Sequence, residues 1–479
     1  MTLPFSPINT AADRPIYHQI YLRIRQSIAD GVLRPGDRVP SVRGLASELN
    51  LARGTVESAY QLLIGEGYLI ARGPAGTVVS PQIRLPEPAG QAVVVPERVP
   101  SLTHTGLTHT GLTPLPLEMG LPALDVFPRK VWNRFAAREM RQSGLHDLVY
   151  PDPRGYPPLR AALAGYLGVS RGVACSPDQV FICAGYRASL DLIRHSVLRH
   201  GDAGWFEEPG YLIARRFLIH AGMTLLPVPV DHDGLDVEAG IRMAPNARFA
   251  VVTPSHQSPL GVSLSLPRRH ALLDWARAGD RWIIEDDYDS EFRYRGRPLP
   301  ALKSLDTAGA GRVLYTGTFS KVLAPRLRLS YLVVPQEQVV RFAETAGRMQ
   351  NQCPRLLQAT LARFIEEGAF ARHISKMRNI YADRRAMLAD ALCAALEPHA
   401  QLHLQAGGMH LLAMLENGSD DDAIAMRARS LGLSVQALSA WCAEATSRRG
   451  LLIGFTNVRS DEEASALSRT LAGALRPEA

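Results

Sequence analysis

Apolar residues recur with the spacing of a helix near the N-terminus of the chain. Isoleucines stand at every fourth position over Ile16–Ile28, which places them on one helical face. Ser41 can cap a second helix after a Pro-Gly turn, and residues 53–65 continue as a third helix. The Gly-rich segment 73–77 then indicates the tip of a hairpin. Residues 14–80 are therefore predicted to form a compact helical unit that ends in a hairpin.

A different pattern begins near residue 117, where short apolar runs alternate with amphipathic segments. The amphipathic segments include 187–200 and 267–279, which have the spacing of surface helices. This alternation predicts an α/β domain with a mostly parallel sheet and helices on both faces. The functional loops of such a sheet lie at the carboxyl ends of its strands. The predicted strands are Val180–Cys183, Phe249–Thr253, Trp282–Ile284 and Val313–Thr316.

The segment between these two patterns is rich in proline. It holds seven prolines and a duplicated Thr-His-Thr-Gly-Leu, a composition typical of an extended linker. After about residue 340 the chain becomes helix-rich, with a strand pair near 407–415 and 450–456 that indicates a smaller second lobe. The predicted parts are a unit at 14–80, a linker at 81–116 and a domain at 117–479 with lobes of about 150–340 and about 341–479.

The composition is that of a globular protein without membrane segments. The 479 residues are 46% hydrophobic, with no apolar run long enough to span a membrane and no secretory leader. We therefore expect a cytoplasmic protein with no membrane partner. The five cysteines are scattered, with no CxxC pair and no histidine cluster at zinc spacing. Neither a disulfide framework nor a metal site is expected.

The N-terminal unit has the order of elements of a DNA-binding helix-turn-helix. Net charge does not decide whether this unit binds DNA. The whole chain has a net charge of +7, but residues 1–80 hold eight arginines against six acids, which is only a small positive excess. In a helix-turn-helix the first residues of the third helix enter the major groove, and here these include Arg53 and Thr55. Arg72 precedes the hairpin tip, where it can reach phosphate or the minor groove. We therefore expect double-stranded DNA as a partner.

This segment resembles the GntR-type winged helix over nearly its whole length. The resemblance rests on Pro-Ser-x-Arg at 40–43 and Ala-Tyr-x-x-Leu at 59–63. The residues that it implies to face DNA are Ser41 and Arg43 at phosphates, Arg53 and Thr55 in the major groove, and Arg72 and Gly76 in the wing.

A lone lysine follows the last predicted strand of the large lobe. The chain has only four lysines, and Lys321 stands after Thr318 and Ser320, with Arg328 seven positions beyond it. Schiff-base chemistry needs an amine that is partly desolvated so that it can be neutral. A phosphate needs hydroxyl donors and a guanidinium group. The pattern therefore predicts a Schiff-base lysine beside a phosphate site.

Other polar groups follow neighbouring strands. A carboxylate at Asp286 can keep a pyridine nitrogen protonated or, alternatively, bind Mg²⁺. No phosphate-binding GxxxxGK[ST] motif accompanies it, which disfavours the magnesium site. The backbone at Gly185, Tyr186 and Arg187 opens a helix and can receive a phosphate. Tyr211 presents an aromatic ring that can stack on a flat cofactor.

Together these motifs resemble the MocR/GabR family of pyridoxal-phosphate regulators, in which a GntR-type winged helix precedes a type I aminotransferase-like fold. The strings EDDYDSEFRYRGRPLPAL at 285–302 and TPSHQSPLG at 253–261 carry the resemblance. It implies pyridoxal 5'-phosphate as cofactor and a head-to-tail homodimer. The implied roles are an aldimine on Lys321, Asp286 at the pyridine nitrogen, Tyr288 at the ring hydroxyl, Tyr211 on the ring, Gly185, Tyr186, Thr318, Ser320 and Arg328 at the phosphate, and Tyr150 at the phosphate bound by the partner subunit.

Several positions depart from the aminotransferase pattern. Ser258 stands where aminotransferases have the asparagine that tunes the ring hydroxyl. The strand at 451–455 lacks the arginine that many of them use for a substrate carboxylate, and Ile213 replaces an arginine of the GABA-sensing member. Arg187 and Ser330 also depart from the family pattern. The arginines that remain as candidate contacts for a ligand anion are Arg215, Arg449 and Arg459.

The leading hypothesis is a transcriptional regulator. Its aminotransferase-like domain would sense a small amine or amino acid, or pyridoxal phosphate itself, and change the spacing of two DNA-binding heads. The alternative is a working aminotransferase with a vestigial DNA-binding module. The Ser258 departure and the intact helix-turn-helix favour regulation, with at most a residual aminotransferase half-reaction.

Overall fold

The computed structural model describes most of the chain as two compact units, Met1–Ser101 and Leu102–Ala479, and each is described here by itself. The predicted linker at 81–116, with its Thr-His duplication, lies mostly outside the described residues, since 84–113 are not among them. The described residues are 15–83, 114–294, 296, 299–307, 309, 311–349, 353–416, 418–443 and 448–475.

The N-terminal unit packs three helices against a two-stranded hairpin. Ser41 caps the second helix, α2 (Val42–Glu48), by accepting a hydrogen bond from the Gly44 amide at 3.0 Å. Ile20, Ile24 and Ile28 are buried against the third helix and the hairpin, as their spacing predicts. The elements are α1 (Ile16–Ala29), α2 (Val42–Glu48), α3 (Arg53–Gly65), β1 (Leu69–Ala71) and β2 (Thr77–Val79).

The C-terminal unit is built on an eight-stranded sheet in the order β3-β10-β9-β8-β7-β4-β5-β6. The run of strands from β5 through β4, β7 and β8 to β9 is parallel, whereas β10 pairs antiparallel with both β9 and β3. The strands are β3 (Val180–Cys183), β4 (Ala203–Glu208), β5 (Thr224–Asp231), β6 (Gly234–Leu235), β7 (Phe249–Val252), β8 (Trp282–Asp287), β9 (Val313–Thr318) and β10 (Ser330–Val333).

Two of the predicted strands are longer than their apolar runs. The sequence suggested that β8 ends at Ile284 and β9 at Thr316, but β8 continues to Asp287 and β9 to Thr318. Two of the acids of β8, Glu285 and Asp287, can stay in the strand because each has hydrogen-bond donors inside the fold. The Glu285 carboxylate, for example, accepts the amides of Leu302 and Lys303 at 2.7 and 2.8 Å.

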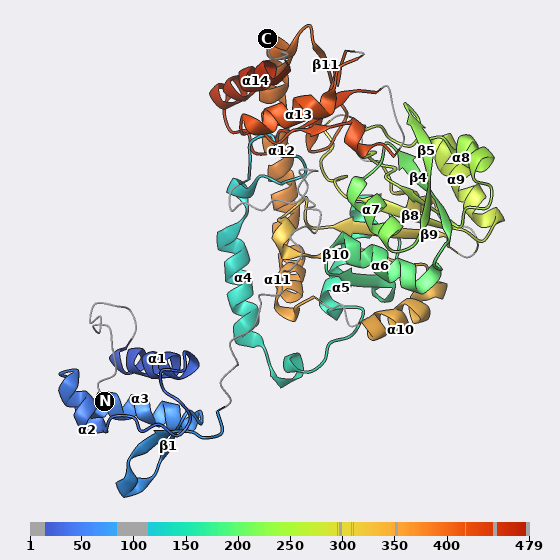
Figure 1. Ribbon diagram of the computed structural model, residues 1–479. Coiled ribbons are helices and arrows are strands. Elements are labelled where there is room, and N and C mark those ends of the chain that lie inside the picture. The colour runs from blue at the N-terminus through green and yellow to red at the C-terminus, as the bar shows by residue number, and fades with distance from the viewer. Residues whose placement is uncertain are drawn as a thin grey trace. The chain divides into compact units, whose positions relative to one another are not determined.

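Helices cover both faces of this sheet because its strands are apolar on both sides. In β7, Phe249 and Val251 pack with one group of helices, and Ala250 and Val252 pack with the other. The first group is α6 (Tyr186–Val197), α7 (Leu212–His220) and α10 (Val339–Met349), and the second includes α8 (Val237–Met243) and α9 (Leu266–Ala278) (Figure 1).

A smaller antiparallel sheet and long helices complete the unit. The strand pair predicted near 407–415 and 450–456 forms, with His410 opposite Gly454. Within the described ranges, no helix is long and apolar enough to cross a membrane. The remaining elements are α4 (Arg129–Gln142), α5 (Pro157–Arg171), α11 (Arg355–Glu366), α12 (Ala369–Leu396), α13 (Asp421–Ser430), α14 (Asp461–Leu475), β11 (Ala400–His403), β12 (His410–Leu415), β13 (Gln436–Ala437) and β14 (Gly450–Gly454).

Candidate functional site

A cavity of about 460 Å³ opens at the carboxyl ends of β8 and β9. Residues far apart in the chain meet there, because parallel strands bring their carboxyl ends to one edge of the sheet. The sequence-predicted residues that line it are Tyr186, Arg187, Tyr211, Asp286, Tyr288, Thr318, Ser320, Lys321 and Arg328. The small lobe and the segment before α4 close it with Glu118, Gly120, Met409, His410 and Trp441.

Lys321 points into this cavity directly after β9. Its Nζ donates a hydrogen bond to the Gly120 carbonyl at 2.7 Å. Burial lowers the pKa of the Lys321 ammonium, while the carboxylates of Asp289, Asp286 and Glu118 oppose that shift. A lowered pKa increases the fraction of neutral amine, which is the nucleophilic form that condenses with an aldehyde.

Asp286 lies on β8 across the cavity, 5% exposed and without an ion pair in the described part of the chain. Burial raises the pKa of Asp286 to about 8, with further increases from Asp287, Glu207 and Asp289. A buried acid of this kind is stabilised by a cation, and a protonated pyridine nitrogen supplies one. The carboxylate therefore has the environment that such a ring needs.

A candidate anion site lies between the end of β3 and the start of α6. Gly185 has φ of +87°, and a Cβ there would stand 2.6 Å from Nη2 of Arg328, so only glycine allows this close approach. Arg328 Nη2 donates to the Ala184 carbonyl at 3.1 Å, which fixes the guanidinium beside the first turn of α6. The Gly185 amide itself donates to the Cys183 carbonyl at 2.9 Å, so the amides that this turn can offer to an anion are those of Tyr186 and Arg187. Amides at a helix N-terminus and a guanidinium group are a strong anion-binding set.

Tyr211 forms an aromatic wall of the cavity. Its ring centroid is 6.1 Å from that of Tyr186 and 5.8 Å from that of Trp441. An aromatic wall of this kind can stack against a flat ring. The donors, the acid, the amine and the wall together fit pyridoxal phosphate.

A buried polar cluster behind Tyr288 was not anticipated from the sequence. His256 Nδ1 lies 2.9 Å from the Tyr288 hydroxyl and 3.1 Å from Asp289 Oδ2. His410 Nε2 lies 2.9 Å from the Pro259 carbonyl, and burial lowers the pKa of His410 to about 4, so its ring is neutral. No local motif signals this cluster, because its members come from three separate segments.

The positions that depart from the aminotransferase pattern are accommodated by the fold. Ser258 lines the cavity, with its amide donating to Thr253 Oγ1 at 3.1 Å. Ser330 Oγ donates to the Cys183 carbonyl at 3.2 Å. Ile213 also lines the cavity wall, which is therefore apolar at this point.

The three arginines considered as anion contacts are engaged elsewhere. Arg215 donates to the carbonyls of Trp441 and Cys442, both at 3.0 Å, and lies 3.7 Å from Glu208. Arg449 lies 3.8 Å from Asp421, and Arg459 lies 3.8 Å from Asp125. None of the three lines the cavity.

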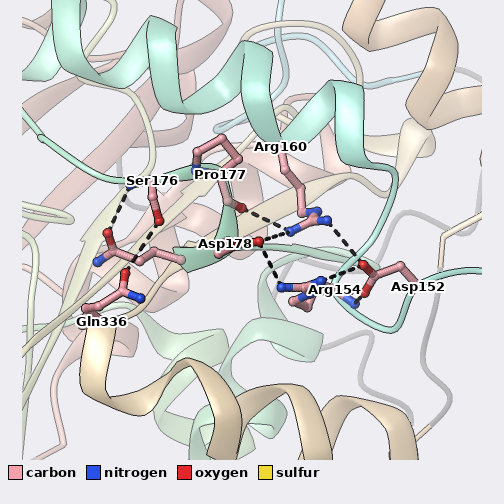
Figure 2. Close-up of polar contacts among 8 residues, drawn as sticks. Asp152, Arg154, Arg160, Ser176, Pro177, Asp178 and Gln336 are labelled. Atoms are coloured by element: carbon pink, nitrogen blue, oxygen red, sulfur yellow. Dashed lines mark hydrogen bonds and ion pairs between the residues drawn. The ribbon is translucent and has the colours of Figure 1, made fainter.

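Tyr150 does not face the cavity of its own chain. It is 97% exposed and follows the exposed apolar residues Leu145, Leu148 and Val149. Just beyond it, the polar network in Figure 2 holds the chain in place. Its members include Asp152 and Asp178, which bind Arg154 at 2.9 Å each and Arg160 at 3.2 and 3.5 Å.

The predicted DNA contacts lie on the surface of the N-terminal unit. Ser41, Arg43, Arg53 and Arg72 are exposed, whereas Thr55 and Gly76 are half-buried. One further candidate was missed: a Cβ on Gly76 would stand 2.7 Å from Nε of Arg38, so the exposed Arg38 side chain lies against the wing glycine. Arg38 lies in the loop between α1 and α2, and no sequence signal marked it as a DNA contact. The pairing of Arg38 with Val78 brings it to the wing.

Comparisons with known proteins match both units. Residues 16–79 match the family model of bacterial regulatory proteins of the gntR family, and residues 126–438 match that of class I and II aminotransferases. The chain is 37% identical to the probable rhizopine catabolism regulatory protein MocR of Rhizobium meliloti, over 93% of this chain and 91% of that protein. It is 32% identical to the pyridoxine biosynthesis regulator PdxR of Corynebacterium glutamicum, over 91% of each.

The C-terminal unit also has relatives among solved structures. One is the α-aminoadipate aminotransferase LysN of Thermus thermophilus, complexed with N-(5'-phosphopyridoxyl)-L-leucine. It is 28% identical, with a TM-score of 0.68, over 75% of this chain and 92% of that one. The fold of the C-terminal unit is therefore that of a class I and II aminotransferase.

Proposed function

Since this chain belongs to the MocR family of transcriptional regulators, with a gntR-type helix-turn-helix before an aminotransferase domain, we propose that it regulates transcription through pyridoxal phosphate held on Lys321. The observation that carries the proposal is the meeting of Lys321, Asp286 and Arg328 in one cavity. When bound, the cofactor supplies an aldehyde that condenses with amines and a ring that withdraws electrons.

The chain's own residues would each have one task in this site. Lys321 holds the aldehyde carbon, Asp286 keeps a proton on the ring nitrogen, and Tyr288 hydrogen-bonds the ring hydroxyl. The phosphate would be held by Arg328, by the hydroxyls of Thr318 and Ser320, and by the amides of Tyr186 and Arg187. Gly185 would contribute its backbone conformation and not its amide, which donates to the Cys183 carbonyl. Support for this assignment comes from the burial of Asp286 and from the glycine-dependent approach of Arg328.

The proposed active form is a head-to-tail homodimer in which Tyr150 reaches the phosphate bound by the partner subunit. Its exposure beside three other exposed apolar residues supports a contact surface there. A small amine or amino acid, or pyridoxal phosphate itself, would then change the geometry of the dimer and the spacing of its DNA-binding heads.

Borohydride reduction followed by peptide mapping tests the cofactor assignment. We expect a visible absorption band that collapses on reduction and a pyridoxyl group on Lys321. The alternative, a working aminotransferase with a vestigial DNA-binding module, predicts repeated turnover with a keto acid and no sequence-selective DNA binding. A protein that stays colourless with pyridoxal phosphate would remove the cofactor from the proposal.

Replacing Asp286 with asparagine is expected to stabilise the cofactor-free protein, increasingly so from pH 5 to pH 8. The pKa of Asp286 is raised from near 4 to about 8, so the wild-type acid lowers stability as pH rises across that window. Asparagine removes this loss, which is about 1.4 kcal/mol for each pKa unit. Thermal unfolding at several pH values measures the difference. A change in stability for Asp286→Asn that is the same at every pH would contradict the raised pKa of this buried acid. The control is Asp274→Asn, because the Asp274 side chain is 75% exposed.

Replacing Arg53 with alanine is expected to weaken operator binding about tenfold or more, since a guanidinium on a base edge contributes about 1 to 3 kcal/mol. Arg43→Ala, at a predicted phosphate contact, should weaken specific and nonspecific binding equally and reduce the salt dependence. Fluorescence anisotropy with an operator selected from a random pool measures both, with the exposed Arg341→Ala on α10 as control. Equal losses on specific and nonspecific DNA for Arg53→Ala would remove it from base reading.

A further inference from the structure

The proposed function gives no task to the side chain that stands behind the Tyr288 hydroxyl. This side chain is His256, whose Nδ1 lies 2.9 Å from the hydroxyl oxygen. His256 is 7% exposed and belongs to the loop between β7 and α9, and it does not line the cavity of Lys321. Its ring is packed closely, because a Cβ on Gly408 would stand 2.2 Å from its Cε1. His256 therefore acts on the cavity through Tyr288.

Asp289 bears on which nitrogen of the His256 ring carries the proton. Its Oδ2 lies 3.1 Å from Nδ1, and its side chain is 1% exposed. Neither oxygen of Asp289 accepts a hydrogen bond in the part of the chain that the structure describes. A carboxylate only accepts, so its charge favours a proton on the nitrogen that faces it. His256 Nε2 is buried without a partner among the same residues, so a proton there would gain no hydrogen bond.

A proton on Nδ1 determines what the Tyr288 hydroxyl can do. Nδ1 then donates to the tyrosine oxygen, so the tyrosine's own proton is directed away from His256. Tyr288 lines the cavity, and burial raises its pKa well above the usual value, so the oxygen keeps that proton at neutral pH. The hydroxyl is thereby free to donate to an oxygen in the cavity. With the proton on Nε2 instead, Tyr288 would donate to Nδ1 and lose this role.

From this geometry, which rests on the proposed function, we infer that His256 and Asp289 are positioning residues that fix Tyr288 as the hydrogen-bond donor to the ring hydroxyl oxygen of the cofactor. Asp289 sets the tautomer of His256, and His256 sets the direction of the Tyr288 proton. A donor at the ring oxygen stabilises negative charge there. This matters most after the nitrogen that joins Lys321 to the cofactor has lost its proton, which the ring oxygen shares until then. The pair therefore lowers the pH at which that proton leaves.

Other charged groups also act on this proton, so the test must leave them in place. His410, whose ring centroid is 6.0 Å from that of His256, is neutral because burial lowers its pKa to about 4. The other charged or histidine side chains that line the cavity of Lys321 or the small cavity beside His256 and Asp289 are Glu118, Arg171, Arg187, Asp286, Arg293, Lys321, Arg328 and His410.

Two amides at position 256 test the inference on the full-length protein loaded with pyridoxal phosphate. Asparagine places its amide nitrogen near the position of Nδ1, whereas glutamine places it near Nε2. His256→Gln should raise the pH midpoint of the change in the cofactor's visible absorption by about one pH unit, a tenfold change in proton affinity, because a donor to a charged oxygen is lost. His256→Asn should keep the midpoint close to that of the wild-type protein. Equal shifts in the two variants, or no shift in His256→Gln, would overturn the inference.

The control is His270→Gln, because His270 is exposed on α9, and it should leave the midpoint unchanged. Tyr288→Phe identifies the route by which His256 acts. It removes the hydroxyl, so it should raise the midpoint at least as far as His256→Gln does. Adding His256→Gln to Tyr288→Phe should then cause no further rise. A further rise of the same size would mean that His256 does not act through Tyr288, and would overturn the inference.

Asp289→Asn tests the remaining member of the cluster. Loss of its charge acts directly on the cofactor in every background, but loss of its hold on the tautomer acts only where His256 is present. The shift caused by Asp289→Asn should therefore be more positive, by at least about half a pH unit, in the wild-type background than in His256→Gln. Equal shifts in the two backgrounds would overturn the role of Asp289. Failure of the proposed function is recognised separately, since the wild-type protein would then show no pyridoxyl group on Lys321 after reduction.

Discussion

Lys321→Ala protein is expected to carry no covalently bound pyridoxal phosphate under conditions that load the wild-type chain fully. The reason is geometric, because the Nζ of Lys321 is the amine that lines the cavity among the described residues. Arg328, the α6 amides and Asp286 would remain, so weak noncovalent binding should persist. Intact-mass spectrometry after borohydride reduction measures the covalent fraction.

The matched control is Lys130→Ala, because Lys130 is exposed on α4 and lies outside the cavity. This variant should be labelled to the same extent as the wild-type chain. Covalent labelling that persists in Lys321→Ala would place the Schiff base on another amine and would undo the assignment of the site.

Arg171→Leu is expected to destabilise the C-terminal unit by about 3 to 5 kcal/mol, the usual cost of removing one partner of a buried ion pair. Arg171 Nε lies 2.7 Å from Asp287 Oδ2, and the two side chains are 4% and 2% exposed. The guanidinium also donates to the Leu299 carbonyl and to Ser255 Oγ, both at 2.8 Å. Tyr315 donates to the same Asp287 oxygen at 2.6 Å. Removing Arg171 therefore leaves a buried carboxylate with only a neutral donor.

Thermal unfolding of the cofactor-free protein measures this loss, and Arg348→Leu is the control. Arg348 lies 3.3 Å from Glu344 on α10, with side chains 77% and 61% exposed. Exposed pairs of this kind contribute about 0.3 to 0.5 kcal/mol. Similar losses in the two variants would mean that the Arg171–Asp287 pair does not anchor the end of β8.

Local patterns were enough to predict the elements that present the site. The third helix and β3 have the bounds that the sequence indicates, because glycines and apolar runs act within a few positions. The polar residues that follow the apolar runs were recognisable as site candidates for the same reason. Their meeting in one cavity follows from the parallel arrangement of the strands.

The features that the sequence did not reveal depend on partners distant in the chain. The carboxylate of Asp287 stays inside β8 because Arg171, 116 positions away, comes from α5 to pair with it. His256 is brought to Tyr288 by close packing, since a Cβ on Gly408 would stand 2.2 Å from its ring. Burial, which sets the protonation of Asp286 and His410, is likewise a property of the whole fold.

The most direct test of the account is the operator affinity of the full-length protein, measured with and without pyridoxal phosphate and the amines that alter its absorption. We expect the operator dissociation constant to change at least about fivefold with ligand, the lower end of typical coupling between sites. We also expect Lys321→Ala to lose this response while still binding DNA. An operator affinity that stays constant with every compound that alters the cofactor's absorption would contradict the coupling.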